Sequence, residues 1–251
     1  MRIVNHPYTI YFLLALLVLV GLFSFSDYGI SWDEDAQIAI GRTSYNYVFK
    51  GDRALFNFCD RDYGVGFKLP LYALQQFFKD PISMYAFRHA CVHLFFLLGV
   101  FFFYKSLLVI FVQNPQRYFL ALLGVLFLIL SPRMYAESFY NSKDLVLLAA
   151  CCINFYTLLR CIHKPDWGST LWHAFTTAFL IDIRIVGVMH FVLALGWLLF
   201  RILASKEQRK EWIRILLLFL FATPLMLYLI WPYLYEDPVH RFVQAFQNMK
   251  Q

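Results

Sequence analysis

Seven stretches with few or no charged residues dominate this chain and leave little choice of fold. They cover residues 8–25, 90–104, 118–130, 145–159, 171–181, 185–200 and 215–234. Hydrophobic residues make up 61% of the chain and charged residues only 15%, whereas a soluble domain is about half apolar and about a quarter charged. With 28 Phe and 16 Tyr to bury, disorder is excluded as well. The sequence predicts an all-α, polytopic membrane helical bundle of about seven spans.

Two of these spans depend on a split in one long apolar stretch. As a single helix, residues 171–200 would measure about 45 Å against a hydrocarbon core of about 30 Å. The helix would also bury Asp182 and Arg184 near the middle of the membrane, which is costly. A hairpin that bends at Asp182-Ile-Arg184 removes this cost. The first stretch, residues 8–25, is long for a signal-peptide core and lacks a small-residue cleavage site, so we expect a retained span.

The basic residues between the spans indicate the orientation. With the N-terminus in the cytoplasm, Arg2 and the basic loop between Arg201 and Arg214 lie inside, as the positive-inside rule requires. The basic net charge of +6 therefore needs no nucleic-acid partner. We expect a multi-pass protein of the cell inner (plasma) membrane, with residues 1–251 forming one transmembrane module.

This topology places four polar clusters on the outer face. They are residues 31–35, 131–144, 182–184 and 231–238. The first outer loop, residues 26–84, contains an amphipathic stretch at residues 70–79 that is typical of an interfacial helix. The second outer loop covers residues 131–144. Several spans are shorter than 20 residues, which favours polar segments that dip into a protein-lined cavity. The sequence thus predicts a site at the outer membrane surface.

Three adjacent acids, Asp33, Glu34 and Asp35, follow the first span. One of them can accept a proton from an acceptor hydroxyl while its neighbour orients it or binds a cation. The same acids would also favour the start of a helix over residues 35–48. Because adjacent side chains point in different directions, at most two of the three serve one site.

A second acid, Asp144, begins the fourth span after Asn141 and Lys143. Asp144 either stabilises the helix start or forms a separated carboxylate pair with Asp33. Such a pair suits a divalent cation or a transferring sugar. The sequence leaves the need for a metal open.

An arginine among apolar neighbours, Arg184, requires an anion. Asp182 is the structural candidate, but two residues apart on a helix the side chains diverge. A phosphate would suit the planar guanidinium. Lys143 is a second cation on the same face.

The remaining polar signals are weaker. His89 and His93 share one helical face at a spacing that metal ligands use, but two interfacial histidines are the commoner explanation of this pattern. Gly64-Val-Gly66 lacks the strand–helix frame and the lysine of a nucleotide loop. Zinc-protease and α/β-hydrolase motifs do not occur in the sequence.

Four elements in order resemble those of the GT-C membrane glycosyltransferases. They are the Asp33-Glu34 pair, Ser-Pro-Arg…Phe-Tyr-Asn-Ser-Lys-Asp144, the Arg184-Ile-Val-Gly element and Trp-Pro-Tyr-Leu-Tyr-Glu-Asp-Pro at residues 231–238. The chain most resembles the phospholipid-carrier-dependent enzymes, which are related to protein O-mannosyltransferases and the lipid A aminoarabinose transferase. Family members usually carry further spans after this last element.

The resemblance implies an inverting transfer of a sugar from a polyprenyl-phosphate carrier to a hydroxyl of a lipid, glycan or protein acceptor. It assigns Asp33, Glu34 and Asp144 to catalysis and Arg184 to the carrier phosphate, with Lys143 as a second candidate for the phosphate. A catalytically silent protein that binds carrier lipid or a partner is an alternative, and a transporter or flippase is another. Against a transporter, the ionisable residues gather at one face and no inverted repeat is present.

Overall fold

The computed structural model describes residues 5–248, and every regular element in that part of the chain is a helix. The predicted all-helical class is thus confirmed. Arg2, which the predicted topology places in the cytoplasm, lies outside the described residues. The elements group into two compact units.

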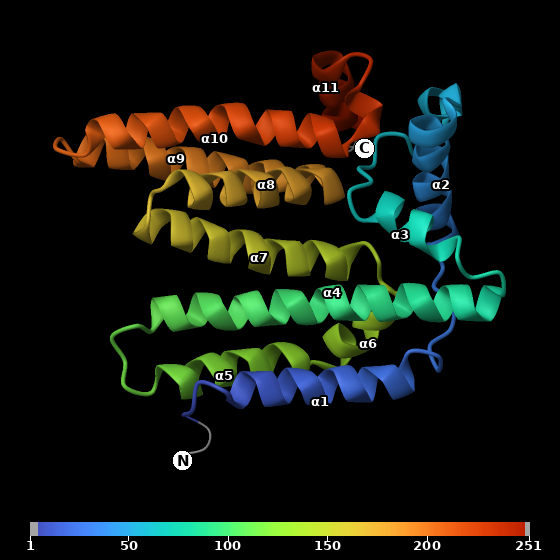
Figure 1. Ribbon diagram of the computed structural model, residues 1–251, viewed down its shortest axis with the longest axis horizontal. Helices are drawn as coiled ribbons and strands as arrows, with labels where there is room; N and C mark the ends of the chain where they lie inside the picture. The colour runs from blue at the N-terminus through green and yellow to red at the C-terminus, as the bar shows by residue number, and fades with distance from the viewer. Residues whose placement is uncertain (1–4, 249–251) are drawn as a thin grey trace. The chain divides into compact units, whose positions relative to one another are not determined.

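The first unit contains the chain up to Gln37 together with Leu74–Tyr156. Its complete helices are α1 (Thr9–Ser24), α4 (Pro81–Ile110), α5 (Arg117–Ile129) and α6 (Pro132–Tyr140). Helices α1 and α5 pack along α4 (Figure 1). Apolar side chains of α1, α4 and α5 form the core, with Ile10, Val100 and Val125 almost fully buried. This packing fixes the end of α1 against the first half of α4.

The second unit contains Ile38–Ala73 and the chain from Thr157 onward. Its complete α-helices are α8 (Trp167–Ile183), α9 (Val188–Ala204), α10 (Arg209–Ile230) and α11 (Pro238–Asn248). Helix α10 packs along both α8 and α9 (Figure 1). Three short 3₁₀ turns, Arg53–Asn57, Ile185–Gly187 and Pro232–Leu234, complete the unit.

Three further helices contribute residues to both units. They are α2 (Glu34–Lys50), α3 (Lys68–Gln75) and α7 (Asp144–His163). Helix α2 begins one residue before the expected range of 35–48, so Glu34 and Asp35 both stand in its first turn. Acids at this position interact favourably with the helix N-terminus. Helix α3 covers the first half of the amphipathic stretch predicted at residues 70–79.

Within the described residues, four helices are long and apolar enough to cross a membrane. They are Pro81–Ile110, Asp144–His163, Ile185–Ala204 and Arg209–Ile230. A fifth span is added if α5 and α6, which are bent by 68° to each other, count as one. Helix α1 has only 16 residues and α8 only 17. The structure therefore shows a multi-pass pattern of four to five candidate spans, where the sequence predicts about seven.

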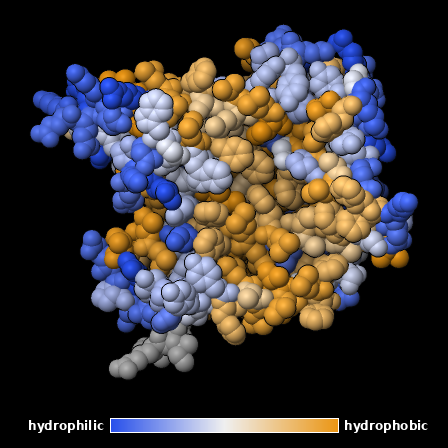
Figure 2. All heavy atoms as spheres, in the orientation of Figure 1, coloured by the Kyte–Doolittle hydropathy of each residue, from blue (hydrophilic) through white to orange (hydrophobic). Residues whose placement is uncertain are grey.

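The surfaces of these helices agree with a membrane location. Figure 2 shows apolar side chains gathered over the middle of the helices and hydrophilic ones near the helix ends. Phe12 on α1, Leu193 on α9 and Phe221 on α10 are 74%, 64% and 70% exposed. Such large apolar side chains do not cover long surfaces of a soluble protein. They suit helices that face lipid.

The long apolar stretch at residues 171–200 is divided where the sequence predicts. Helix α8 ends at Ile183, and Arg184 adopts an extended conformation with φ −148° and ψ 134°. A 3₁₀ turn over Ile185–Gly187 then leads into α9, which packs against α8. Gly187 permits this turn because a Cβ there would lie 2.6 Å from the carbonyl carbon of Leu180. A single helix across the stretch is excluded.

Candidate functional site

The acid segments at residues 31–35 and 131–144 of the first unit meet through Ser31. The Ser31 hydroxyl oxygen lies 3.2 Å from Asp33 Oδ1 and 3.5 Å from the carbonyl oxygen of Tyr140. The ring of Tyr28 stacks on Phe139 at 4.4 Å, and burial raises the pKa of the Tyr28 hydroxyl. The loop that carries Asp33 thus packs on the end of α6, four residues before Asp144. Asp33 itself is half-buried.

The neighbouring acid, Glu34, is held in a buried polar cluster. Arg88 Nε donates to Glu34 Oε1 at 3.1 Å, and His89 Nε2 lies 3.3 Å from Glu34 Oε2. A second guanidinium nitrogen of Arg88 donates to Gln75 Oε1 at 2.7 Å. Glu34 is only 2% exposed, and Arg88 and His89 are each 1% exposed. With both carboxylate oxygens engaged, Glu34 fixes the first turn of α2 to α4.

The third acid, Asp35, takes a different direction. It is exposed and accepts a hydrogen bond of 2.8 Å from the hydroxyl of Tyr85. The expectation that adjacent acids diverge therefore holds for this run, because Asp33, Glu34 and Asp35 contact different partners.

Asp144 begins α7 and is exposed at the surface of the first unit. Its backbone N–H donates to Asn141 Oδ1 at 2.7 Å, and that of Lys143 donates to the same oxygen at 3.2 Å. In α6, which precedes this turn, Arg133 Nε donates to Glu137 Oε1 at 2.7 Å and holds the pKa of that carboxyl below its usual range. Asn141 thus fixes the turn before α7, and Asp144 stands in the first turn of that helix.

The two histidines of α4 contact different groups. His89 lies between Glu34 and the carbonyl oxygen of Phe25, which is 3.1 Å from His89 Nδ1. His93 Nδ1 lies 2.9 Å from the Ser138 hydroxyl, and the His93 ring stacks on Phe139 at 4.2 Å. Over residues 5–248, no group of three or more His, Cys, Asp or Glu side chains is arranged to hold a metal ion. For these histidines, the described contacts are those of a packed helix interface.

In the second unit, Asp182 anchors the loop at residues 64–66, a contact that the sequence does not predict. The Asp182 carboxylate accepts from the backbone N–H of Val65 at 3.1 Å and of Gly66 at 2.6 Å. Lys68 Nζ donates to the carbonyl oxygen of Gly64 at 2.9 Å, and Lys68 is 6% exposed. Gly64-Val-Gly66 is therefore a docking loop. Asp182, which the sequence offers as the structural partner of Arg184, uses both carboxylate oxygens to bind this loop.

Arg184 also belongs to the second unit and follows this anchored residue by two positions. It directly follows the last residue of α8, with an extended backbone, and it is half-buried. The docked loop and the turn at Ile185–Gly187 fix the backbone on either side of it. Arg184 is thus presented from a rigid break between two helices.

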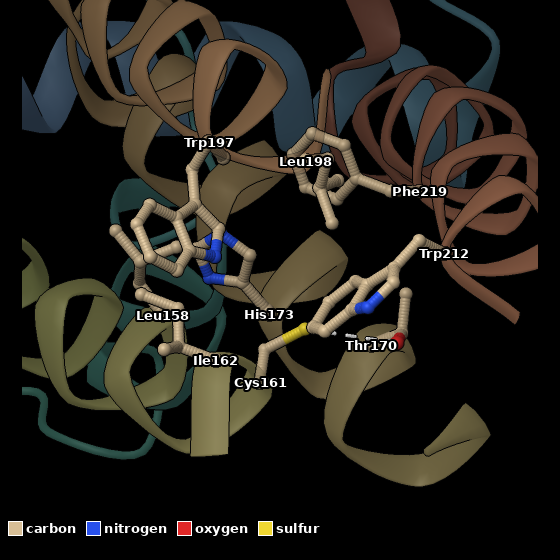
Figure 3. A pocket seen from close by; sticks show the side chains of 10 residues that line it. Leu158, Cys161, Ile162, Thr170, His173, Trp197, Leu198, Trp212 and Phe219 are labelled. Atoms are coloured by element: carbon tan, nitrogen blue, oxygen red, sulfur yellow. Dashed lines mark hydrogen bonds between the residues drawn. The ribbon is translucent and has the colours of Figure 1, made fainter. Parts of the chain in front are cut away.

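One cavity and two grooves described in the second unit are either too small or too apolar to form an acid-lined site. The cavity in Figure 3, which lies among α7, α8, α9 and α10, has a volume of about 10 Å³. Trp197, Trp212 and His173 line it, and it has room for about one water molecule. Two larger grooves of about 480 and 360 Å³ lie beside α11 and are lined almost wholly by apolar side chains.

Comparisons with protein-family models, with curated proteins and with solved structures gave no match to this chain. The functional assignment therefore depends on the residues and their geometry alone.

Arg88 and Gln75 are the polar residues that sequence reasoning missed. Arg88 stands just before the apolar run at residues 90–104, where a cation usually reaches out to water. A signal for its burial was present, because Arg88 and His89 follow a loop with an excess of acids. The choice of Glu34 as the partner required the packing of α1 and α4.

Proposed function

We propose that this chain is a membrane glycosyltransferase of the GT-C type, which transfers a sugar from a polyprenyl-phosphate carrier to an acceptor hydroxyl with inversion. The contact of Ser31 with both Asp33 and the backbone of Tyr140 is the observation that carries the proposal. It brings the first-loop acid to the segment that leads into Asp144. Two carboxylates from separate loops are what a hydroxyl acceptor and a transferring sugar require.

We assign the role of general base to Asp33. Glu34 is committed to Arg88 and His89 through both of its oxygens, so it serves to position Asp33 rather than to take a proton. Asp33 is half-buried, and its carboxylate accepts a hydrogen bond from the Ser31 hydroxyl. A proton that leaves the acceptor hydroxyl goes to the Asp33 carboxylate, while the oxygen forms the new bond to the sugar and the lipid phosphate leaves.

Within the same proposal, Arg184 binds the carrier phosphate, for which a guanidinium is well suited, and Lys143 is the second candidate for this role. Asp144 then orients the sugar or, with Asp33, a divalent cation. Membrane lipids surround the helices, and nucleic acid has no part in the function. The membrane is the cell inner membrane, with the N-terminus in the cytoplasm.

The proposed topology has seven spans, and it adds α1 and α8 to the four long helices and α5. At 16 and 17 residues these helices measure about 25 Å. They are short for a hydrocarbon core of about 30 Å, but local thinning of the bilayer or tilt of longer neighbours accommodates such a difference at modest cost.

Transfer of label from a radiolabelled polyprenyl-phosphate sugar, in membranes that contain this chain, tests the function. We expect the Asp33→Asn variant to fold and insert normally and to lose at least about 100-fold in transfer, as loss of a general base does. Asp35→Asn is the matched control, because Asp35 is an exposed acid two residues away. Equal turnover by Asp33→Asn and the wild type would transfer the base role to another acid. No label transfer by the wild-type chain would refute the proposed function.

A further inference from the structure

His89 and Glu34 form a buried pair whose hydrogen-bond partners fix its proton content. We propose that this pair is a proton-binding site, in which His89 is a stably protonated imidazolium opposite the Glu34 carboxylate. In the proposed function Glu34 only positions Asp33, so the proton of this pair takes no part in the sugar transfer and can be tested without it.

The first step is a count of donors and acceptors around the His89 ring. Nδ1 lies 3.1 Å from the carbonyl oxygen of Phe25, which can only accept, so Nδ1 must carry a hydrogen. Nε2 lies 3.3 Å from Glu34 Oε2. A neutral imidazole has one N–H and cannot donate at both positions. One further proton is therefore required on the line between Nε2 and Oε2.

The surroundings decide on which atom this proton rests. Arg88 donates to the other oxygen of Glu34, which favours the carboxylate form of the acid. Phe25 is the C-cap residue of α1, so the negative end of that helix faces Nδ1 and favours an imidazolium. The remaining charged neighbour on α2, Asp35, is turned to Tyr85. Gln75 of α3 satisfies the second arm of Arg88. The Glu34 carboxylate is thus bound through both oxygens, and each nitrogen of the His89 ring faces an oxygen.

His93, one helical turn further along α4, provides a built-in comparison. It is 3% exposed, so its burial matches that of His89. The Ser138 hydroxyl lies 2.6 Å from the carbonyl oxygen of Tyr135 and 2.9 Å from His93 Nδ1. His93 has no carboxylate partner in these contacts. The ring also forms a hydrogen bond to the backbone of Leu17. We expect His93 to be neutral, with one hydrogen on its ring.

Solid-state NMR of the uniformly ¹⁵N,¹³C-labelled full chain in lipid bilayers at neutral pH tests the proposal. Sequential backbone assignment identifies both rings, so no variant is needed for this step. We expect a directly bonded hydrogen on each nitrogen of His89 and on only one nitrogen of His93. A single bonded hydrogen on the His89 ring, on either nitrogen, would overturn the proposal.

The Glu34→Gln variant gives a second test. The amide nitrogen of glutamine can donate to Nε2, so the pair no longer needs the extra proton. We expect His89 to lose the hydrogen on Nε2 and to keep the one on Nδ1, with the spectrum of His93 unchanged. Two hydrogens on His89 in this variant would show that the proton does not depend on Glu34 and would contradict the site. The outcome is independent of sugar transfer, because it is measured without donor or acceptor.

Discussion

The docking of Gly64 on Asp182 leads to a sharp prediction for the Gly64→Ala variant. A Cβ at position 64 would overlap the carbonyl oxygen of Asp182 and lie 2.5 Å from its carbonyl carbon. Both atoms are backbone atoms at the end of α8, where Asp182 is 1% exposed. A methyl group therefore cannot be accommodated by a side-chain rotation. We expect the loop to leave Asp182.

The cost of this movement can be worked out from the contacts that are lost. The Asp182 carboxylate would lose its hydrogen bonds from Val65 and Gly66. Hydrogen bonds to a charged group contribute about 1.5–3 kcal/mol each, so the two together amount to roughly 3–6 kcal/mol. The buried carboxylate that remains adds a desolvation cost unless water reaches it. We expect the free energy of unfolding to fall by about this amount.

Reversible unfolding of the purified chain in mixed micelles, followed by circular dichroism as sodium dodecyl sulfate is added, measures the effect. Gly196→Ala is the matched control, because it lies in the same unit and a Cβ there meets nothing within 4 Å. The control should differ from the wild type by no more than about 1 kcal/mol, the difference in helix propensity. If Gly64→Ala were as stable as Gly196→Ala, the loop would not be docked on Asp182 as described.

Three other predictions concern topology, the carrier phosphate and the buried cluster. Cysteines placed at Ser205 and Asp60, with the native cysteines removed, should react with a membrane-impermeant reagent from opposite sides; reaction from one side would refute the seven-span topology. Polyprenyl phosphate should raise the melting temperature of the wild type more than that of Arg184→Ala, and an equal rise would refute the phosphate role. Arg184→Lys should lower the affinity for the carrier at nearly unchanged stability, because lysine keeps the charge but lacks the planar guanidinium. Glu34→Ala should lower the free energy of unfolding by about 3–5 kcal/mol, because it leaves the buried Arg88 without its carboxylate partner. The double variant Glu34→Leu with Arg88→Met should recover most of this loss. Additive losses in the double variant would mean that the two side chains are not coupled.

Hydrophobic patterning predicts the helices of this chain well, because burial of apolar surface decides where they form. The break at Arg184 follows from the cost of two charges inside one long helix, and α8 does end at Ile183. Patterning is less informative about helix ends. The stretch at residues 90–104 becomes part of the 30-residue helix Pro81–Ile110, since Asp80 caps it and Arg88 and His89 are neutralised by partners. Such partners come from other elements, so they are invisible to a local pattern.

The candidate site illustrates the same distinction at the level of single residues. Sequence reasoning selects Asp33 and Glu34 together because both are acids after a span. The structure separates them, since Glu34 is almost fully buried and Asp33 is half-buried. Likewise, the sequence indicates no role for Gly64-Val-Gly66, because its docking on Asp182 depends on a contact 117 residues away in the chain. Neither contact follows from composition or spacing.

The burial of Glu34 also explains why two adjacent acids can have different chemical roles. An ionised group is stable inside a protein only when opposite charges and hydrogen bonds replace its hydration. Arg88 and His89 do so for Glu34, and this fixes the carboxylate in one position. A fixed and paired carboxylate is a poor proton acceptor, but it is a good anchor for the backbone beside it. Asp33, one residue away and bound only through a hydroxyl in the contacts described, gains a defined position from that anchor and keeps the capacity to accept a proton.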